Sequence, residues 1–581
     1  MARFLAHIAA GPDGDQARSA FIATMANWFE PDRLISHGPL TLAIVDGPAI
    51  RLDQGVVIGA LFDRRYPEIL QNLRDEDKRK LSDSDRAHLI KTFWGDYVAF
   101  LVSPVDSAVS VIRAPLANLP CYHQVVEGGL LLASDIALLE RATGRLPSPD
   151  WNAIARELAC AELRQPETCL DGIETLAPGF ELCIAGAVQS TKTLWSPWAF
   201  VDRHNERPAN AWIEEIRRSV LNCTAARASA CDRVALLLSG GLDSSIVAAA
   251  LGTQRPVDLL TLYTSDRIGD ERGYARAVAE HLGRPLREIR RDPRQIDPGR
   301  SEARRLPRPA TRLFEQETRR ITQTLAAETG AQAVFTGGGG DNVFCALQSA
   351  APAADRLLRQ GLGRGFMTTA RDISLLAGVG VSRVVRAALL RALPWNRQRP
   401  VPLDLSYLSA DVQAAVKTHL YPHPWLHASQ RPLPGTAAHI KLLALAQSFA
   451  DRYDPQDPIP TIAPLLSQPL VETCLAVPSW LWFDAGRNRR LARSAFAGRL
   501  PDPILQRRSK GTPESFVGEI FETHHGRLRD MLLGGRLIQE GLVDCNIVEA
   551  AFRGGPRMAP PDILSLLRLV DVEAWLQARA R

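Results

Sequence analysis

The 581-residue sequence lacks several features that would point to particular classes of protein. Its nine cysteines are scattered and none forms a C-x2-C pair, which argues against a zinc site. Their odd number is typical of reduced thiols in a cytoplasm. No apolar stretch reaches membrane length without a break, and the first residues contain no apolar core of a signal peptide. We therefore expect a cytoplasmic protein without a membrane span.

Lysine is also scarce, since only seven of the 69 basic residues are lysines. A lysine beside a motif is therefore informative. The net charge of +5 is small for this length and gives no reason to expect a nucleic-acid partner. Hydrophobic residues make up 46% of the chain, which is enough for sizeable cores, and the length predicts two to four domains.

The most informative stretch is Ser239–Ser245, which reads SGGLDSS. An apolar run at 234–238 predicts a buried strand before it, and the apolar run 246–251 predicts a helix after it. Two glycines, a helix N-terminus and serine hydroxyls form an anion cradle. No lysine ends the stretch, so it is not the G-x-x-x-x-G-K-[ST] loop; instead, Asp243 offers a hard oxygen to magnesium. The alternative is a structural turn without a ligand.

A second glycine-rich turn follows the apolar run 333–335. Four glycines at 337–340 precede Asp341 and leave the backbone open to a ligand at a cost in ordering entropy. A flexible linker is the alternative, but a linker seldom lies between a strand and an apolar helix start. We expect Thr336 and Gly337 near the adenosine or the α-phosphate, with Asp341 as the partner of Asp243 on magnesium.

Strand and helix alternate across this half of the chain, which predicts a parallel α/β sheet with ligands at the carboxyl ends of its strands. The run 257–263 is the second expected strand, and a helix is expected to open near Asp270 and Glu271. Acidic residues at a helix start have two explanations, compensation of the helix dipole or a role in the site. The sequence leaves both open.

Residues 1 to about 200 contain short apolar runs punctuated by turn residues, which predicts a strand-rich layered domain. Residues 353–399 contain nine arginines, no lysine and two aspartates, and they predict helices with breaks at the glycines. The alternatives for this segment are a solvated basic face or a cleft edge that receives an acidic peptide or partner. Near the C-terminus, Lys510 stands in an R-x-x-K-G turn; it is either a surface lysine or a group that neutralises phosphate charge.

Taken in order, these motifs resemble the asparagine synthetase / β-lactam synthetase family, which also contains the macrolactam-forming cyclases of lasso peptides. The resemblance covers roughly residues 40 to 515 and is strongest at 239–245, 336–341 and 507–511. It implies a strand-rich glutamine amidotransferase-like (Ntn-type) layered domain at 1–205. At 206–581 it implies an asparagine synthetase-like ATP pyrophosphatase domain, with a parallel α/β sheet and helical additions. The segments that resemble the amidotransferase domain are 94–100, 113–116, 120–122, 132–138, 168–179 and 194–197.

The resemblance also implies the chemistry. Members of this family adenylate a carboxylate with ATP and magnesium, release pyrophosphate, and pass the acyl group to an amine with release of AMP. Lys510 and Arg507 are then the expected catalytic residues, Asp243 and Asp341 the metal ligands, and Asp270 and Glu271 further site acids. The expected ATP-binding residues are Leu238, Ser239, Gly240, Gly241, Leu242, Asp243, Ser244, Ser245, Leu262, Tyr263, Thr264, Thr336, Gly337 and Gly338.

Two departures from the family pattern point to the substrate. The family's glutaminase uses a cysteine exposed after removal of Met, but here the residue is Ala2, so ammonia is not the expected acceptor. β-Lactam synthetases carry a Tyr and asparagine synthetases a Glu where this chain has Gly338. The resemblance is therefore greatest to lasso peptide cyclases, which close a macrolactam between a core peptide's N-terminal amine and an internal Asp or Glu.

That resemblance implies three partners: a precursor peptide, a leader peptidase and a leader-recognition protein. Two other classes remain open. One is a small-molecule amide-forming synthetase of the β-lactam or asparagine type. The other is a non-catalytic binding protein that keeps the fold.

Overall fold

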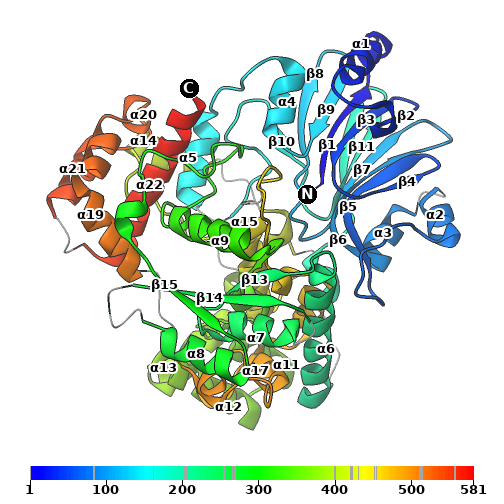
Figure 1. The fold of residues 1–581 in the computed structure, drawn as a ribbon. Coiled ribbons are helices and arrows are strands. Elements are labelled where there is room, and N and C mark those ends of the chain that lie inside the picture. Colours follow the sequence, from blue (N-terminus) through cyan, green and yellow to red (C-terminus); the bar gives the residue numbers. More distant parts are fainter. Residues whose placement is uncertain are drawn as a thin grey trace.

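The computed structural model describes most of the chain. The described residues are 2–82, 85–160, 163–201, 207–252, 255–264, 266, 270–397, 401–418, 423–428, 431–450, 452, 454–508, 514–554 and 558–580. The N-terminal and C-terminal parts lie side by side, and the parallel sheet lies below the two antiparallel sheets in the view of Figure 1.

The N-terminal part contains two antiparallel sheets, each of six strands in the described residues. Their orders are β10-β8-β9-β1-β3-β2 and β12-β11-β7-β6-β5-β4. The strands are β1 (Arg3–Ala9), β2 (Leu34–His37), β3 (Leu40–Asp46), β4 (Ala49–Leu52), β5 (Gly55–Asp63), β6 (Phe93–Val102), β7 (Val109–Arg113), β8 (Tyr122–Val126), β9 (Gly129–Ala133), β10 (Glu174–Thr175), β11 (Phe180–Ala185) and β12 (Val188–Thr193).

The two sheets pack face to face, and apolar side chains from both form one core between them. Phe4 of β1 and Phe100 of β6 meet edge to face in this core, with ring centroids 5.2 Å apart. The helices of this part are α1 (Gly14–Ala26), α2 (Asp75–Ser82), α3 (Arg86–Thr92), α4 (Ile136–Thr143) and α5 (Trp151–Cys160). The strand-rich layered domain expected from the sequence is confirmed.

The C-terminal part is built on a parallel sheet of order β15-β14-β13-β16-β17. Successive residues of β13 face opposite sides: Leu236 packs with α6, α7 and α8, whereas Ala235 packs against α9. Both faces are thus covered, as parallel sheets require, and the predicted α/β architecture is confirmed. The strands are β13 (Val234–Leu237), β14 (Val257–Tyr263), β15 (Leu286–Arg290), β16 (Ala333–Phe335) and β17 (Thr461–Ile462).

Helices make up most of the rest of this part. Those around the sheet are α6 (Ala209–Ala228), α7 (Leu242–Leu251), α8 (Arg272–His281), α9 (Glu315–Thr329), α10 (Gly340–Val343), α15 (Pro434–Ala450), α16 (Gln468–Ala476), α17 (Arg490–Ala495) and α18 (Asp502–Gln506). The helical additions are α11 (Ala351–Gln360), α12 (Arg364–Ala377), α13 (Val381–Ala392), α14 (Ala410–Thr418), α19 (Glu514–Leu533), α20 (Arg536–Gln539), α21 (Cys545–Arg553) and α22 (Pro560–Arg579).

A buried carboxylate joins the two parts. Glu472 of α16 accepts two hydrogen bonds from Arg64, at 2.6 and 3.0 Å, and one from the indole nitrogen of Trp195, at 2.9 Å. Arg64 follows β5 and Trp195 follows β12, so the N-terminal part provides both donors. Burial strengthens such charge-assisted bonds and makes an unpaired Glu472 costly, which holds the parts in one orientation.

The stretch Ser239–Ser245 is not the seven-residue turn that the sequence predicted. Helix α7 begins at Leu242, so the second half of the stretch forms its first turn. Gly240 has a φ of +70°, and this left-handed residue lets the chain pass from β13 to the helix through only four residues. The expected domain boundary at 205/206 lies outside the described residues and stays a prediction.

Within the described residues, no individual helix has the length and apolar character needed to cross a membrane.

Candidate active site

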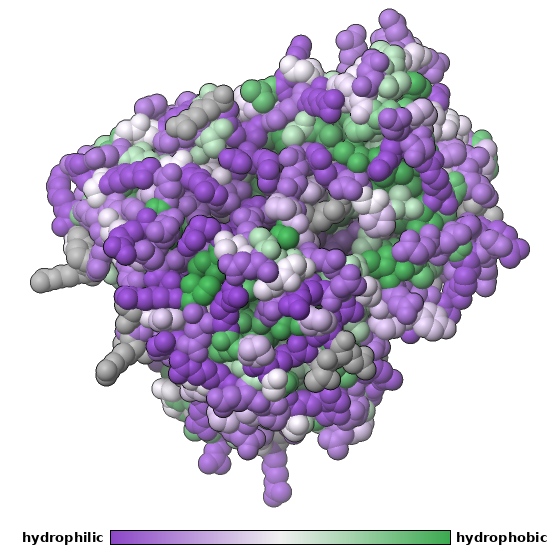
Figure 2. Space-filling view, viewed as in Figure 1, coloured by the Kyte–Doolittle hydropathy of each residue, from purple (hydrophilic) through white to green (hydrophobic). Residues whose placement is uncertain are grey.

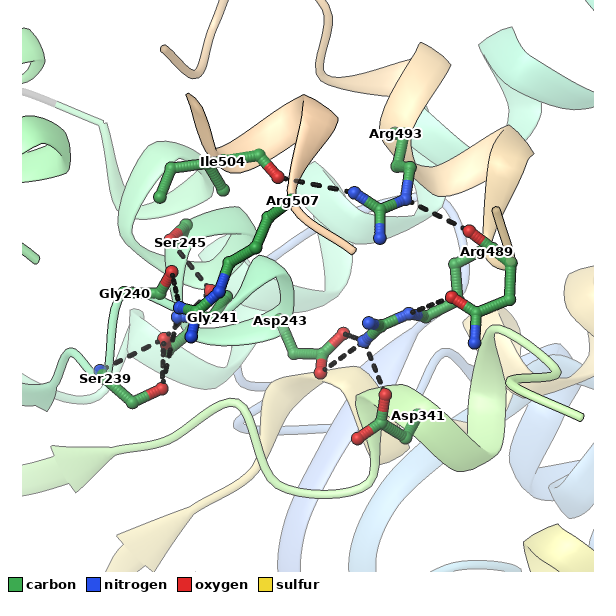
Figure 3. Close-up of polar contacts among 12 residues, drawn as sticks. Ser239, Gly240, Gly241, Asp243, Ser245, Asp341, Arg489, Arg493, Ile504 and Arg507 are labelled. Atoms are coloured by element: carbon green, nitrogen blue, oxygen red, sulfur yellow. Dashed lines mark hydrogen bonds and ion pairs between the residues drawn. The ribbon is translucent and has the colours of Figure 1, made fainter. Parts of the chain in front are cut away.

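The site lies at the carboxyl ends of β13 and β16, where the turns that follow the two strands meet (Figure 3). A Cβ on Gly240 would lie 2.6 Å from Cβ of Tyr274, so only glycine allows the turn after β13 to pack against α8. Leu238 directly follows β13 and is 1% exposed, so it anchors the start of the turn in the core.

Serine hydroxyls fasten this turn to the first turn of α7. The backbone N–H of Ser239 donates to Oγ of Ser244 at 3.2 Å, and Ser245 donates its hydroxyl to the carbonyl of Gly241 at 2.8 Å. Gly241 is the N-cap of α7, and no side chain caps the helix there. The N-terminus of α7 therefore presents the partial positive charge of the helix dipole without a side-chain cap, which favours an anion there.

The second glycine-rich turn packs directly on α7. A Cβ on Gly337 would lie 2.4 Å from the backbone nitrogen of Ser244, and one on Gly340 would lie 2.5 Å from Cγ of Asp243. Glycine at both positions thus lets the backbone that precedes Asp341 approach Asp243. The sequence predicted that the two aspartates would meet, and the structure brings them together.

A single guanidinium nitrogen lies between the two aspartates (Figure 3). Nη1 of Arg489 is 3.1 and 3.0 Å from the two carboxylate oxygens of Asp243, and it also donates to Oδ1 of Asp341. Asp243 is 4% exposed, whereas the side chain of Asp341 is 48% exposed. Carboxylate oxygens from two elements therefore converge on one cationic position that opens to solvent on the Asp341 side.

Arg507 contacts the turn after β13 at Gly240. Its Nη1 donates to the carbonyl of Gly240 at 3.1 Å, Nη2 pairs with Glu271, and its guanidinium lies 4.0 Å from the centroid of the Tyr274 ring. A side chain held by three different groups is fixed in position beside the anion cradle.

The two expected site acids behave differently. Glu271 is the N-cap of α8 and reaches Arg507. Asp270 instead forms a two-point ion pair with Arg272, at 2.9 and 2.7 Å, which holds the pKa of that carboxyl below its usual range. Only Glu271 is brought to the centre of the site.

The expected nucleotide residues of β14 lie at the carboxyl end of the same sheet. Leu262 and Tyr263 end the strand, and the guanidinium of Arg272 stacks on the Tyr263 ring at 3.8 Å. Oγ1 of Thr264 is buried without a hydrogen-bond partner among the described residues. A buried hydroxyl of this kind is ready to bond a ligand at this edge.

Lys510 lies outside the described residues, so its expected role stays a prediction. The segment that leads to it is held by Arg493, whose Nη1 donates to the carbonyls of Ile504 at 3.3 Å and Leu505 at 2.8 Å.

A cavity of about 330 Å³ opens beside the second glycine-rich turn. Thr336 and Gly338 line the part of the cavity nearest the site. A Cβ on Gly338 would lie 3.4 Å from Cδ1 of Phe449, which also lines the cavity. Its lining combines apolar and charged side chains, and the charged ones form ion pairs, among them Arg452 with Glu315 and Arg319 with Asp457. The apolar residues are Leu237, Val334, Phe449, Ile459 and Leu466; the charged residues are Glu302, Glu315, Arg319, Arg452, Asp454 and Asp457.

Sequence reasoning gave no role to Arg489, Arg493 or Tyr274. Arg489 stands in the run 486–493, whose four arginines are the only signal in the sequence. In a chain with 62 arginines that signal is weak. Tyr274 appeared in the sequence only as part of the helix opening after Glu271.

The residues present fit magnesium and a nucleoside triphosphate, which the sequence predicted. Two carboxylates around one cationic position supply the hard oxygens that magnesium prefers. An uncapped helix N-terminus, Arg489 and Arg507 supply positive charge for phosphates, and Thr264 supplies a buried hydroxyl without a described partner. Among the described residues, no group of three or more His, Cys, Asp or Glu side chains forms a metal site. A metal here would therefore take its remaining ligands from phosphate or water.

No curated protein matches the chain. Among the solved structures that match, two show low similarity to this chain. The glutamine phosphoribosylpyrophosphate amidotransferase from B. subtilis, complexed with ADP and GMP, is 11% identical with a TM-score of 0.20, over 58% of this chain and 82% of that one. A structure described as the allosteric regulatory enzyme of purine biosynthesis is 13% identical with a TM-score of 0.19, over 57% and 80%. At TM-scores this low, neither likeness bears on fold or function.

The family comparison is more informative. The model of the asparagine synthase family matches residues 215–577, a range that begins in α6 and ends in α22 and contains every element of the site. The chain therefore belongs to the asparagine synthase family of ATP-dependent amide-forming synthetases.

Proposed function

We propose that this protein closes a macrolactam ring in a precursor peptide, as a lasso peptide cyclase does. The observation that carries the proposal is the 330 Å³ cavity beside Gly338. Because Gly338 has no side chain, the cavity continues to the turn that holds Asp341. Such a volume suits a substrate larger than one amino acid, since pockets for drug-sized molecules begin near about 300 Å³.

In the first step, the adenylation of the peptide, each part of the site has its own role. The side-chain carboxylate of an Asp or Glu in the peptide attacks the α-phosphorus of ATP, and the bond from that phosphorus to the bridging oxygen of the β-phosphate breaks. The turn at Ser239–Ser244 and the N–H groups of α7 bind the pyrophosphate that leaves, while Asp243 and Asp341 hold magnesium. Arg507, and Lys510 beyond it, stabilise the charge that builds at the reacting centre.

The second step forms the amide. The peptide's N-terminal amine attacks the activated carbonyl carbon, the bond to AMP breaks, and the proton of the amine leaves to solvent. Overall, one ATP becomes AMP and pyrophosphate, and the peptide loses one water.

The cysteines of the N-terminal domain argue against ammonia from glutamine as the acceptor. Burial raises the pKa of the Cys121 thiol to about 12 and that of Cys160 to about 11, and it raises the pKa of Cys169 and Cys183 as well. A thiol with a raised pKa is a poor nucleophile at neutral pH. We propose that the domain instead supports the synthetase and docks partners. Those partners are the precursor peptide, a leader peptidase and a leader-recognition protein.

The test is reconstitution. The purified protein, incubated with ATP, magnesium and a leader-free core peptide that bears an N-terminal amine and an internal Asp or Glu, is expected to release AMP and pyrophosphate. Mass spectrometry should show loss of one water, and a peptide with the acid changed to Asn or Gln should stay linear. Formation of asparagine from aspartate and glutamine would contradict the proposal and favour a small-molecule synthetase.

A further inference from the structure

The helical additions include a basic segment, residues 351–397, that the chemistry above does not use. It comprises α11, α12, α13 and the short turn after them, and α12 lies at the lower end of the molecule in Figure 1. The segment contains eight arginines and two aspartates, with neither lysine nor glutamate. Its sequence is compatible with either a solvated face or a binding surface. The ion pairs and the exposure of its side chains distinguish the two.

Both acids of the segment are used internally. Asp355 is fully buried and accepts hydrogen bonds from the backbone of Gly435 at 2.6 Å and from the hydroxyl of Ser479 at 2.7 Å. Asp372 accepts from the backbone N–H groups of Ala485 and Gly486, beside the arginine run of the site. Neither carboxylate is therefore placed to neutralise the outward face.

Four arginines on that face carry uncompensated charge. Arg364, Arg371, Arg383 and Arg386 are exposed, and none forms an ion pair with another residue that the structure describes. Exposed arginines elsewhere do form such pairs: Arg553 lies 3.0 Å from Glu549. The outward face of α12 and α13 is therefore cationic.

Large apolar side chains share this face. Met367 and Leu375 alternate with Arg364 and Arg371 along α12 at spacings of three and four, so all four lie on one side of the helix. Six such side chains are exposed in the segment: Leu362 (76%), Met367 (49%), Leu375 (59%), Leu389 (44%), Leu390 (48%) and Trp395 (80%). Apolar side chains that lie beside cationic ones on one side of a helix favour a binding surface over a purely solvated face.

We propose that this face binds an anionic membrane surface. The apolar side chains enter the boundary between headgroups and acyl chains, and the arginines bind the lipid phosphates. The helices lie in the interface rather than cross it, because α12 has 14 residues, α13 has 12, and the pair is bent by 116°. In the view of Figure 2, long hydrophilic side chains project from the lower end of the molecule, and a projecting surface suits a deformable bilayer.

A bilayer fits better than an acidic protein partner. Arginine and apolar side chains are interspersed over two helices, as in interfacial amphipathic helices, whereas protein interfaces concentrate their binding energy in a central apolar cluster within a polar rim. Binding here would be peripheral and salt-dependent. It is independent of the proposed ring closure, so either proposal can fail alone.

Sedimentation with vesicles tests the proposal. The full-length protein is expected to bind vesicles of phosphatidylcholine with added phosphatidylglycerol, to ignore pure phosphatidylcholine, and to dissociate as salt rises. The variant R364Q/R371Q/R383Q/R386Q should bind at least about 100-fold more weakly, since each basic residue near the surface adds substantially to affinity. The variant M367S/L389S/L390S/W395S keeps the charge and should also lose binding.

The matched control, R294Q/R527Q/R529Q/R553Q, removes four arginines that are exposed elsewhere and should bind like the wild type. Circular dichroism checks that each variant is folded. Failure of the wild type to bind anionic vesicles overturns the proposal, as does an equal loss in the control. Binding to polyglutamate without binding to vesicles also overturns it and assigns the face to an acidic protein.

Discussion

Arg489 places one guanidinium nitrogen within 3.1 Å of both carboxylate oxygens of Asp243. The same nitrogen bonds Asp341, so the arginine holds the position that a magnesium ion between the two aspartates would take. Two cations cannot share that position, so Arg489 would have to move for a metal to bind there. In this structure the arginine pairs with both aspartates.

We therefore expect Arg489→Gln to increase the dependence of stability on magnesium. Without the arginine, the two carboxylates repel each other until a cation binds, so magnesium should raise the Tm of the variant more than that of the wild type. Differential scanning fluorimetry with and without magnesium measures this difference. Arg276→Gln, which removes an exposed arginine paired with Glu288, is the control. Equal magnesium shifts in all three proteins would contradict the interpretation.

Asp243→Asn and Asp341→Asn should each reduce pyrophosphate release by at least about 100-fold, because each removes a charged ligand from the position that stabilises the leaving group. The measurement is pyrophosphate release with substrate peptide and ATP, and circular dichroism should show a folded protein. Asp292→Asn changes a partly exposed aspartate that pairs with Arg294 outside the site and should leave the rate unchanged. Normal turnover in both site variants would refute their assignment as ligands.

The adjacent glycines 337 and 338 should respond unequally to alanine. A Cβ at 337 would lie 2.4 Å from the nitrogen of Ser244, so Gly337→Ala must push the turn away from α7 and should cost about 1–3 kcal/mol. A Cβ at 338 would lie 3.1 Å from Oγ1 of Thr336, a tight contact that a small shift of the hydroxyl relieves, so Gly338→Ala should cost less stability. Denaturant unfolding compares the two, and equal losses would show that the turn is not packed as described.

Arg507→Lys should slow pyrophosphate release by about 10- to 100-fold. A lysine cannot bond the carbonyl of Gly240, pair with Glu271 and stack on Tyr274 at once, and a charge-assisted hydrogen bond contributes about 1.5–3 kcal/mol. The variant Glu271→Gln removes only the ion pair and should have a smaller effect. A larger loss in Glu271→Gln than in Arg507→Lys would mean that the glutamate, rather than the arginine, acts on the substrate.

Asp571 should make stability fall with rising pH. Burial raises the pKa of its carboxyl to about 8 in the folded protein, whereas the unfolded value is near about 3.9. The folded state therefore holds a proton that the unfolded state has lost, so the contribution is fully present below about pH 4 and is lost as pH rises to about 8. Asp571→Asn should flatten this part of the pH profile of unfolding free energy. Identical slopes in variant and wild type would contradict the raised pKa.

Much of the fold could be predicted from the sequence because it depends on local patterns. The apolar runs 234–238 and 257–263, each followed by glycine or acidic residues and a helix, suffice for a parallel α/β sheet. The serines, glycines and aspartate of Ser239–Ser245 suffice for an anion cradle. The start of α7 was misplaced by a few residues, since Leu242–Ser245 suit a turn and a first helical turn equally well.

The sequence by itself determined the parallel sheet and the two glycine-rich turns, because each follows from residue types at short spacing. The order of its motifs along the chain carried the resemblance to the family and the expectation that Asp243 and Asp341 meet. Only the tertiary structure decided which distant groups meet. It placed Arg489, 246 residues beyond Asp243, between the two aspartates, and it joined Arg507 to Glu271 but left Asp270 aside. It also placed the cavity beside Gly338 and turned the acids of 351–397 inward. Such contacts depend on how helices pack around the sheet, and residue order along the chain does not specify that packing.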